Sequence, residues 1–159
     1  MTIPTKTELI TDIIRHLELA VAEAQDSLNS LNHSMTEETK SSAGDKYETQ
    51  REMLQAELNL AEKQKSIRLS NLNTFKHLIS AADNSTDDTK CTPGKFLHLH
   101  FQNQPLLVFF GLGFGDIKTT SFSIKGVGTD SPLGQILMNQ HKGEQITFNQ
   151  KSISILDCF

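Results

Sequence analysis

The residues best suited to chemistry are carboxylates that gather around position 40. Glu37, Glu38, Asp45 and Glu48 lie within one short stretch of the chain. Mg²⁺ often takes only one or two carboxylates from any one protein, so such acids could complete the coordination of an ion held by another molecule. The alternative is a solvated turn whose acids stand at the start of a helix, where the helix dipole favours them.

A second candidate group is basic. Lys63, Lys65 and Arg68, with Lys76 further along, make one stretch of the chain locally positive. Such a group could guide an RNA backbone by neutralising its phosphates, and a solvated helix face is the plainer alternative. The net charge of −4 and the pI near 5.8 argue against an autonomous binder of duplex DNA. Any contact with nucleic acid, such as nascent RNA, is therefore expected to be local.

Two further motifs are weaker. Gly111-Leu-Gly-Phe-Gly115 lacks the spacing of a nucleotide-binding loop, so we expect a glycine-rich turn or bulge between strands. His98 and His100 would share one face of a strand, as metal ligands can. No cluster of other ligand types accompanies them, so solvent-facing side chains are expected, and we predict no metal of the protein's own.

Composition and length bound the class of protein. The chain has 159 residues, of which 36% are apolar and 21% charged, as in folded proteins. Its two cysteines, Cys91 and Cys158, form no CxxC pair, which favours a reduced, cytoplasmic setting. The first residues lack the pattern of a secretory signal, and no apolar run approaches the roughly 20 residues that span a bilayer. We expect no membrane partner.

The first half of the chain has the pattern of two helices that form a coiled-coil seam. Apolar residues recur at alternating four- and three-residue steps. One series is Ile10, Ile14, Leu17, Val21, Ala24, Leu28 and Leu31, and the other is Tyr47, Leu54, Leu58, Ala61, Leu72, Phe75 and Ile79. Thr5-x-x-Glu8 is a capping box that starts the first helix near residue 5 or 6. Arg51, Lys65 and Arg68 interrupt the second series and can lay their alkyl stems along the partner helix.

The stretch between these helices predicts a hairpin. Residues 34–44 carry no apolar stripe and are rich in Ser and Thr, which favours a turn or tip. The second helix is then expected from about Ser42 to Ser80. A short connection makes two long helices antiparallel neighbours, so we expect a hairpin over residues 1–80 that projects on the order of 45–55 Å.

The second half predicts a small β-rich domain. Residues 81–94 are small and polar, which marks a linker, and the period of the apolar residues beyond it falls to two. About five short strands are expected in residues 95–159, at Phe96–Phe101, Leu106–Phe110, Phe122–Lys125, Ile146–Phe148 and Ile153–Leu156. Ser131-Pro132 begins a short helix, and Asn149-Gln150 is expected to form a tight hairpin turn. The predicted fold class is α+β, a helical hairpin followed by this domain.

Two stretches resemble the bacterial GreA/GreB transcript-cleavage factors, and the resemblance in element order covers essentially the whole chain. Asp130-Ser-Pro-Leu-Gly-Gln-Ile-Leu137, followed by Lys142-Gly-Glu144 and two closing strands, is similar to the D/N-S-P-[ILM]-[AG]-x-x-[IL] helix, K-x-G-[DE] turn and terminal hairpin of that family. Tyr47-x-x-x-Arg51-Glu52 resembles the E-Y-x-x-A-R-E that follows the family's tip.

The resemblance implies a function and a set of docking residues. It implies an FKBP-like C-terminal domain that docks on bacterial RNA polymerase at the rim of the secondary channel, while the hairpin reaches down the channel. Asp130, Ser131 and Pro132 occupy the positions of the docking loop. The alternative is that Ser131 and Pro132 merely cap the short helix, and both can be true.

One departure from the family concerns the catalytic tip. The two working carboxylates of the family stand seven and four residues before the Tyr, and those places here hold Lys40 and Ala43. Unless Glu37, Glu38 or Asp45 substitutes, the pair that would hold a second Mg²⁺ is missing. The protein is expected to be a monomer with no tightly bound cofactor, sharing at most the Mg²⁺ of the polymerase, and not an enzyme by itself.

Three alternatives stay open at this point. A chain without the acid pair could occupy the channel as a regulator that alters transcription without chemistry. A coiled-coil interaction or assembly module, unrelated to polymerase, would use the seam between chains. An enzyme that uses the β-domain as a binding pocket is the third.

Overall fold

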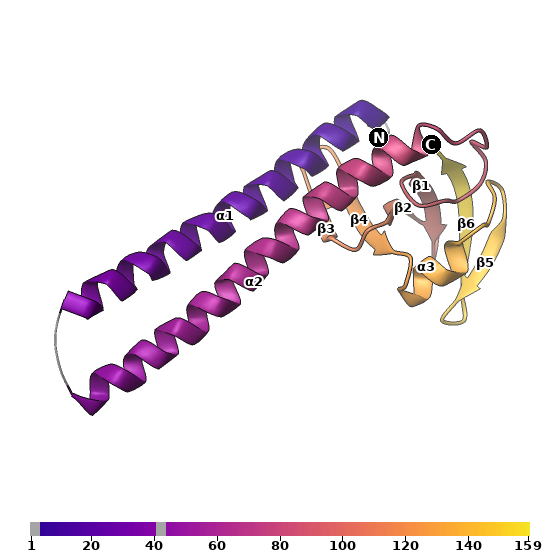
Figure 1. The fold of residues 1–159 in the computed structure, drawn as a ribbon. Coiled ribbons are helices and arrows are strands. Elements are labelled where there is room, and N and C mark those ends of the chain that lie inside the picture. The colour runs from indigo at the N-terminus through magenta and orange to yellow at the C-terminus, as the bar shows by residue number, and fades with distance from the viewer. Residues whose placement is uncertain (1–3, 41–43) are drawn as a thin grey trace. The chain divides into compact units, whose positions relative to one another are not determined.

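The computed structural model describes residues 4–40 and 44–159, without the side chains of residues 38–40 and 45. Helices α1 (Lys6–Lys40) and α2 (Asp45–Ala82) precede six strands and a short helix, α3 (Pro132–Leu137) (Figure 1). The α+β class is therefore confirmed. The described chain divides into two compact units, a hairpin unit of residues 15–72 and a sheet unit of residues 4–14 and 73–159. Among the helices described, none is long and apolar enough to cross a membrane.

In the hairpin unit the two helices run antiparallel and side by side (Figure 1). Leu17 and Ala24 of α1 and Leu58 and Leu72 of α2 are buried, so the predicted four-three register is confirmed at these positions. It is wrong at Tyr47, which is 45% exposed. Arg68 stands at a seam position and is half-buried, and its Nη1 donates to the carbonyl oxygen of Ala20 at 2.8 Å. Arg68, which interrupts the apolar seam of α2, thus forms a hydrogen bond to α1.

Helix α1 is longer than the sequence pattern predicts. Residues 34–40 are helical, where a turn was expected. The Ser34 hydroxyl donates to the carbonyl oxygen of Ser30 at 3.1 Å, and Thr36 makes the same bond one turn back, so these side chains do not break the helix. Met35 is half-buried and extends the seam by one step.

The start of α1 has the predicted capping box. The Thr5 amide donates to Oε2 of Glu8 at 2.8 Å, and the Glu8 amide donates to the Thr5 hydroxyl at 3.3 Å. The bonds from Thr5 lower the pKa of Glu8. Lys6 Nζ lies 3.0 Å from Asp83 Oδ1, which ties this end of α1 to the residue after α2.

The buried stripe of α1 shifts at this end. Leu9 and Ile13 are fully buried, whereas Ile10 and Ile14 are half-buried, so the stripe lies one residue away from the predicted register. A four-three pattern describes packing against one partner helix. This end of α1 belongs instead to the sheet unit, so its buried face is not set by a partner helix alone.

The sheet has the strand order β3-β4-β2-β1-β6-β5. Neighbouring strands are antiparallel except for β2 and β4, which are parallel. The strands are β1 (Phe96–Phe101), β2 (Gln104–Gly111), β3 (Gly115–Lys118), β4 (Ser123–Gly128), β5 (Gln145–Phe148) and β6 (Lys151–Cys158). Five of them confirm the predicted strands. The prediction missed β3, because it directly follows the glycine-rich turn and buries only Ile117.

The alternation of side chains along the strands builds a core on each face of the sheet. One core is aromatic, with Phe75 of α2 lying 4.7 Å from Phe109, and Phe96 and Phe114 lying 5.3 and 5.9 Å from Phe109, between ring centroids. The other core is mainly aliphatic and includes Leu97, Leu99, Val108, Phe110, Val127, Leu137, Ile153 and Ile155 together with Cys91 and Cys158.

Two hairpin turns of the sheet have both central residues at positive φ. Asn149 and Gln150 have φ of 49° and 63°, which confirms the predicted turn between β5 and β6. Gln102 and Asn103, at 54° and 61°, form the turn between β1 and β2. This is the backbone of a type I′ turn, whose twist matches that of the strands.

The segment between α2 and β1 is held by backbone hydrogen bonds. The Cys91 amide donates to the carbonyl oxygen of Gln140 at 2.7 Å, and Lys90 forms a β-bridge with His141. The Gly94 amide donates to the carbonyl oxygen of Phe110 at 2.7 Å. The domain limits drawn from the sequence, 1–80, 81–94 and 95–159, stay a prediction.

Candidate functional site

The tip of the hairpin carries the first set of candidate residues. Glu37 stands in the last turn of α1 and its side chain is exposed. Asp45 is the first residue of α2. The side chains of Glu38, Lys40 and Asp45 lie outside the described residues, and Ala43 lies outside them altogether. Whether the tip acids gather therefore stays a prediction.

The motif just beyond the tip points into solvent. The Tyr47 amide donates to the carbonyl oxygen of Gly44 at 2.9 Å, which closes the first turn of α2. The Tyr47 side chain is 45% exposed, and Arg51 and Glu52 are exposed as well. These residues are available for contact with a partner.

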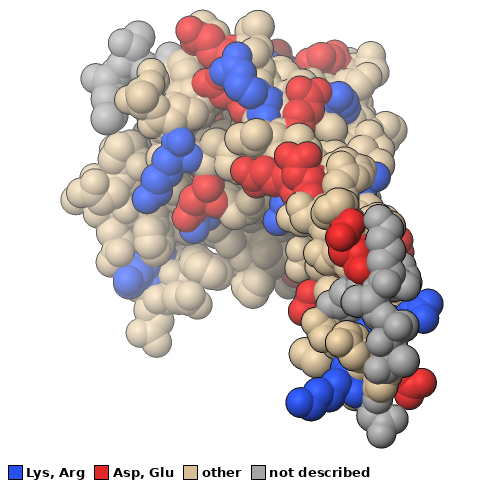
Figure 2. All heavy atoms as spheres, turned by 90° about the vertical axis from the view of Figure 1, so that its left-hand side faces the viewer, with Lys and Arg blue, Asp and Glu red and all other residues tan. Residues whose placement is uncertain are grey.

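The basic residues of α2 do not form one face. Lys63 is exposed, whereas Lys65 is half-buried at the seam and Arg68 is bonded to Ala20. Residues two apart on a helix point to different sides, so Lys63 and Lys65 diverge. On the face that Figure 2 presents, acidic and basic side chains are interspersed. Of the three RNA-guiding candidates, Lys63 is the most accessible.

The loop before α3 carries the predicted docking residues. Ser131 is the N-cap, since its hydroxyl accepts from the Gly134 amide at 3.0 Å and donates to the carbonyl oxygen of Gly128 at 2.7 Å. Pro132 stands at the first helical turn, where its missing amide costs nothing. Asp130 and Pro132 are exposed. The capping role is thus present, and it leaves both flanking side chains facing solvent.

Gly134 holds this loop, although the sequence motifs assign it no role. A Cβ on Gly134 would collide with the carbonyl oxygen of Gly128, whereas a Cβ on Gly128 would meet Oδ1 of the exposed Asp130 side chain at 2.8 Å, which can move aside. Position 134 therefore needs glycine for α3 to approach the end of β4. A glycine in the first turn of a helix, where alanine is normally preferred, was the available signal.

The Lys142-Gly143-Glu144 turn has a structural role. Lys142 Nζ lies 2.7 Å from Asp157 Oδ1 on β6, and this ion pair raises the pKa of Lys142. Glu144 Oε2 accepts from the His141 amide at 2.6 Å, and Gly143 has a φ of 89°. The motif pins the turn that precedes β5 to the last strand.

His98 and His100 lie on β1 with ring centroids 6.3 Å apart. His98 is half-buried and His100 is exposed. Among the side chains that the structure describes, which exclude those of Glu38 and Asp45, no three of His, Cys, Asp or Glu are placed to hold a metal ion.

Comparisons with known proteins give a structural likeness only. No protein-family model matches this sequence, and no curated protein matches it either. The chain is similar to the crystal structure of GreA factor homolog 1 (Gfh1) of Thermus thermophilus, with 13% identity, a TM-score of 0.36, and coverage of 96% of this chain and 93% of that one.

Two further structures are similar to the same degree. They are Gfh1 of Thermus aquaticus, with 12% identity, a TM-score of 0.35 and coverage of 89% and 94%, and a structure of the transcription factor Gfh1, with 15% identity, a TM-score of 0.34 and coverage of 91% and 92%. Values this low do not assign a function, which has to be inferred from the residues.

Proposed function

We propose that this chain is a Gre-like transcription factor that binds bacterial RNA polymerase at the secondary channel and modulates elongation. The loop at Asp130–Pro132 carries the proposal. Its exposed side chains are held by the Ser131 cap and by the close approach of Gly134 to Gly128, so that they are presented in one fixed arrangement. Pre-ordered loops lose little conformational entropy on binding.

The hairpin is the element that would enter the channel. The part of α1 from residue 15 to Lys40 is about 39 Å long at 1.5 Å per residue. Near its far end, Tyr47, Arg51 and Glu52 are exposed. A slender pair of helices with a polar end is suited to a narrow, water-filled cavity. Lys63 is the exposed cation that we propose for contact with the nascent RNA.

The tip favours occupation of the channel over cleavage of RNA. The positions of the family's two acids hold Lys40 and Ala43, and helix α1 continues to Lys40. Glu37 stands almost one helical turn before that end. We therefore infer a regulator that supplies no carboxylate pair to the polymerase Mg²⁺, is not an enzyme itself, and acts as a monomer in the cytoplasm.

Binding to core RNA polymerase tests the docking loop. We expect the full chain to bind and the Asp130→Ala/Pro132→Ala double variant to bind at least about tenfold more weakly, which corresponds to about 1.4 kcal/mol. Asp88→Ala, an exposed acid elsewhere in the sheet unit, is the matched control and should bind normally. Absence of binding at micromolar protein, or equal binding by the double variant, would refute the proposal.

A backtracked elongation complex tests the tip. We expect added protein to change elongation without shortening the RNA beyond the rate of polymerase alone. Shortened RNA that depends on Glu37, Glu38 and Asp45, seen by substituting all three with alanine, would show that these acids act and would overturn the non-cleaving inference.

A second candidate function has one observation in its favour. Met53, Leu60 and Ile67 are 62%, 57% and 51% exposed and follow one another at seven-residue steps along α2, which is the repeat of a coiled-coil seam. A second copy of this chain could cover that stripe and make the protein an assembly module. Sedimentation of the full chain decides this: a concentration-dependent dimer that Leu60→Glu dissolves would favour assembly, and a monomer would exclude it.

A further inference from the structure

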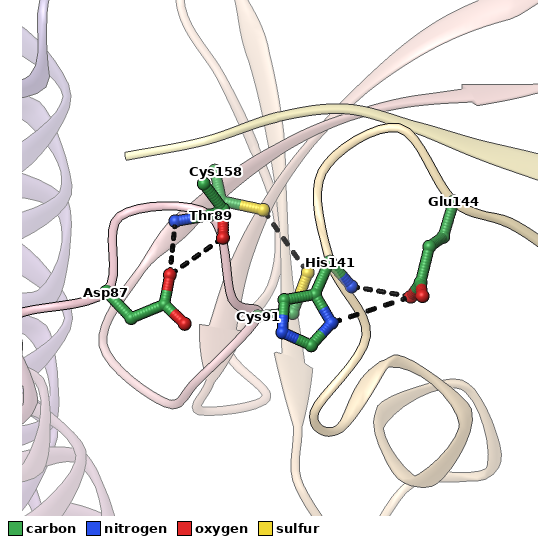
Figure 3. Close-up of polar contacts among 6 residues, drawn as sticks. All are labelled: Asp87, Thr89, Cys91, His141, Glu144 and Cys158. Carbon is green, nitrogen blue, oxygen red and sulfur yellow. Dashed lines mark hydrogen bonds and ion pairs between the residues drawn. The ribbon is translucent and has the colours of Figure 1, made fainter.

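The two cysteines of this chain are 67 positions apart in the sequence but meet in the structure (Figure 3). Their Sγ atoms lie 3.3 Å apart, in hydrogen-bond contact, and both side chains are buried. Both are free thiols. Two buried thiols in contact can form a disulfide with each other, which two separate thiols in one chain cannot do.

Each cysteine is held by a separate part of the sheet unit. Cys91 forms two backbone hydrogen bonds with the segment after α3. Its amide donates to the carbonyl oxygen of Gln140 at 2.7 Å, and its carbonyl oxygen accepts from the Asn139 amide at 3.1 Å. Cys158 pairs with Leu97 at the end of β6. A disulfide needs a sulfur separation of about 2.05 Å, so the two sulfurs would have to approach each other by about 1.3 Å.

The loop that leads to Cys91 is itself fixed. Asp87 Oδ1 accepts from the Thr89 amide at 2.9 Å and from its hydroxyl at 2.7 Å (Figure 3). Thr89 in turn accepts through its carbonyl oxygen from the Lys142 amide at 2.7 Å. Cys91 is therefore presented to Cys158 by ordered backbone on both of its sides.

A buried cation prepares the pair for reaction. Lys95 is 3% exposed, and its ammonium group donates to the carbonyl oxygen of Asp87. With Cys91 as the donor of the shared hydrogen bond, that bond, and after it the charge of Lys95, lower the pKa of Cys158, whereas the bond and burial raise the pKa of Cys91. Because the thiolate is the nucleophilic form of cysteine, Cys158 is the sulfur that attacks.

We propose that Cys91 and Cys158 are a redox pair that a peroxide converts into an intramolecular disulfide. The Cys158 thiol loses its proton, and the thiolate attacks one oxygen of hydrogen peroxide. The released hydroxide takes up that proton to form water, and a sulfenic acid is left on Cys158. Cys91 then loses its proton, attacks the Cys158 sulfur and displaces a second hydroxide, which takes up that proton. The two thiols are oxidised by two electrons, and one peroxide is reduced to two waters.

The disulfide would close a covalent loop of the chain that contains the β-domain. Cys91 precedes β1 and Cys158 is the last residue of β6, so all six strands and α3 lie between them. A crosslink that closes so long a loop restricts the unfolded chain strongly and stabilises the folded one. Oxidation would thus change the stability of the sheet unit without changing its fold, whatever the protein binds.

Peroxide treatment of the folded full chain tests the proposal. With hydrogen peroxide in modest excess and a chelator present, the intact protein should lose the mass of two hydrogen atoms, and denatured thiol titration should fall from two groups to none. Peptide mapping should join the segments around residues 91 and 158. The melting temperature should rise by about 5–15 °C, and dithiothreitol should reverse every change.

Single variants test the order of the steps. In Cys91→Ser, whose folding circular dichroism can verify, Cys158 should stop at a sulfenic acid that dimedone traps, whereas Cys91 in Cys158→Ser should resist oxidation. Two titratable thiols remaining after treatment of the wild-type chain, a disulfide between chains, or gain of oxygen without loss of hydrogen would overturn the proposal. Equal reactivity of Cys91 in Cys158→Ser would do so as well.

Discussion

The two compact units of this protein are stabilised in different ways. The hairpin unit has a narrow seam in which Leu17, Leu58 and Leu72 are buried and Arg68 takes a seam position. The sheet unit has a core on each face of its sheet, one of them a cluster of phenylalanine rings. Because free energy of folding grows with the apolar area removed from water, the sheet unit should hold most of the stability.

The units also differ in how they treat their motif residues. Around the tip, Tyr47 and Arg51 are exposed and free to meet a partner, whereas Ser131, Lys142 and Glu144 of the sheet unit are engaged in hydrogen bonds within the protein. The motif residues of the hairpin are thus exposed, whereas in the sheet unit the internally bonded motif residues lie beside two exposed ones, Asp130 and Pro132.

The largest expected effect comes from removing an aromatic ring of the sheet unit. Phe75→Ala should lower the free energy of unfolding by about 3–5 kcal/mol, because the ring is fully buried and packs at a tilt against Phe109. Urea unfolding measures this. The control is Leu60→Ala in the hairpin unit, 57% exposed, which should change the free energy by about 0.5 kcal/mol or less. Equal losses would contradict the contrast between the units.

A smaller effect is expected at the loop before α3. Gly134→Ala should cost about 2 kcal/mol, because its methyl group collides with the carbonyl oxygen of Gly128. Polymerase binding should fall at the same time if the loop docks. Gly113→Ala, where the nearest atom is an ordinary 3.6 Å away, is the control for a glycine substitution without a collision. A Gly134→Ala protein with unchanged stability would show that α3 does not need this close approach.

The hairpin seam should show a weaker response. Arg68→Ala removes the hydrogen bond to the Ala20 carbonyl and the packing of the Arg stem, and should cost about 1 kcal/mol. Helical circular dichroism during thermal unfolding follows this loss. Lys63→Ala, an exposed cation on the same helix, should leave the transition in place. The comparison fails if the two substitutions behave alike.

The smallest effect is a pH dependence at the start of α1. The hydrogen bonds from Thr5 lower the pKa of Glu8 in the folded state. Its stabilisation is therefore fully present above the pKa of an unfolded Glu, about 4.3, and is lost as the pH falls through the folded value. The melting temperatures of wild type and Glu8→Gln should differ at neutral pH and converge in acid. Glu62→Gln, an exposed acid in mid-helix, should show no such convergence.

The features that the sequence predicted depend on neighbours in the chain. The Thr5–Glu8 capping box, the Ser131 cap and the Asn149-Gln150 turn are local, because each is decided by a few consecutive residues. The features that it missed depend on partners far along the chain. Burial of Leu9 in place of Ile10, and the meeting of Cys91 with Cys158, require knowledge of which segments pack together.

Two other differences from the prediction have a local cause. The Ser and Thr residues after position 33 predict a break in the helix, but the hydroxyls of Ser34 and Thr36 donate to carbonyl oxygens one turn back. Strand β3 was hidden by the preceding glycines and by having a single buried residue, Ile117. The need for glycine at position 134 comes from the carbonyl of Gly128, which a linear pattern does not reveal.

The lengths of the outer strands have a consequence for aggregation. The two edges of the sheet, β3 and β5, are each only four residues long, whereas the eight-residue strands β2 and β6 lie inside it. Short edges offer another chain few unpaired amides and carbonyls to extend. A folded molecule is thus a poor template for fibril growth, even at the concentrations reached during overexpression.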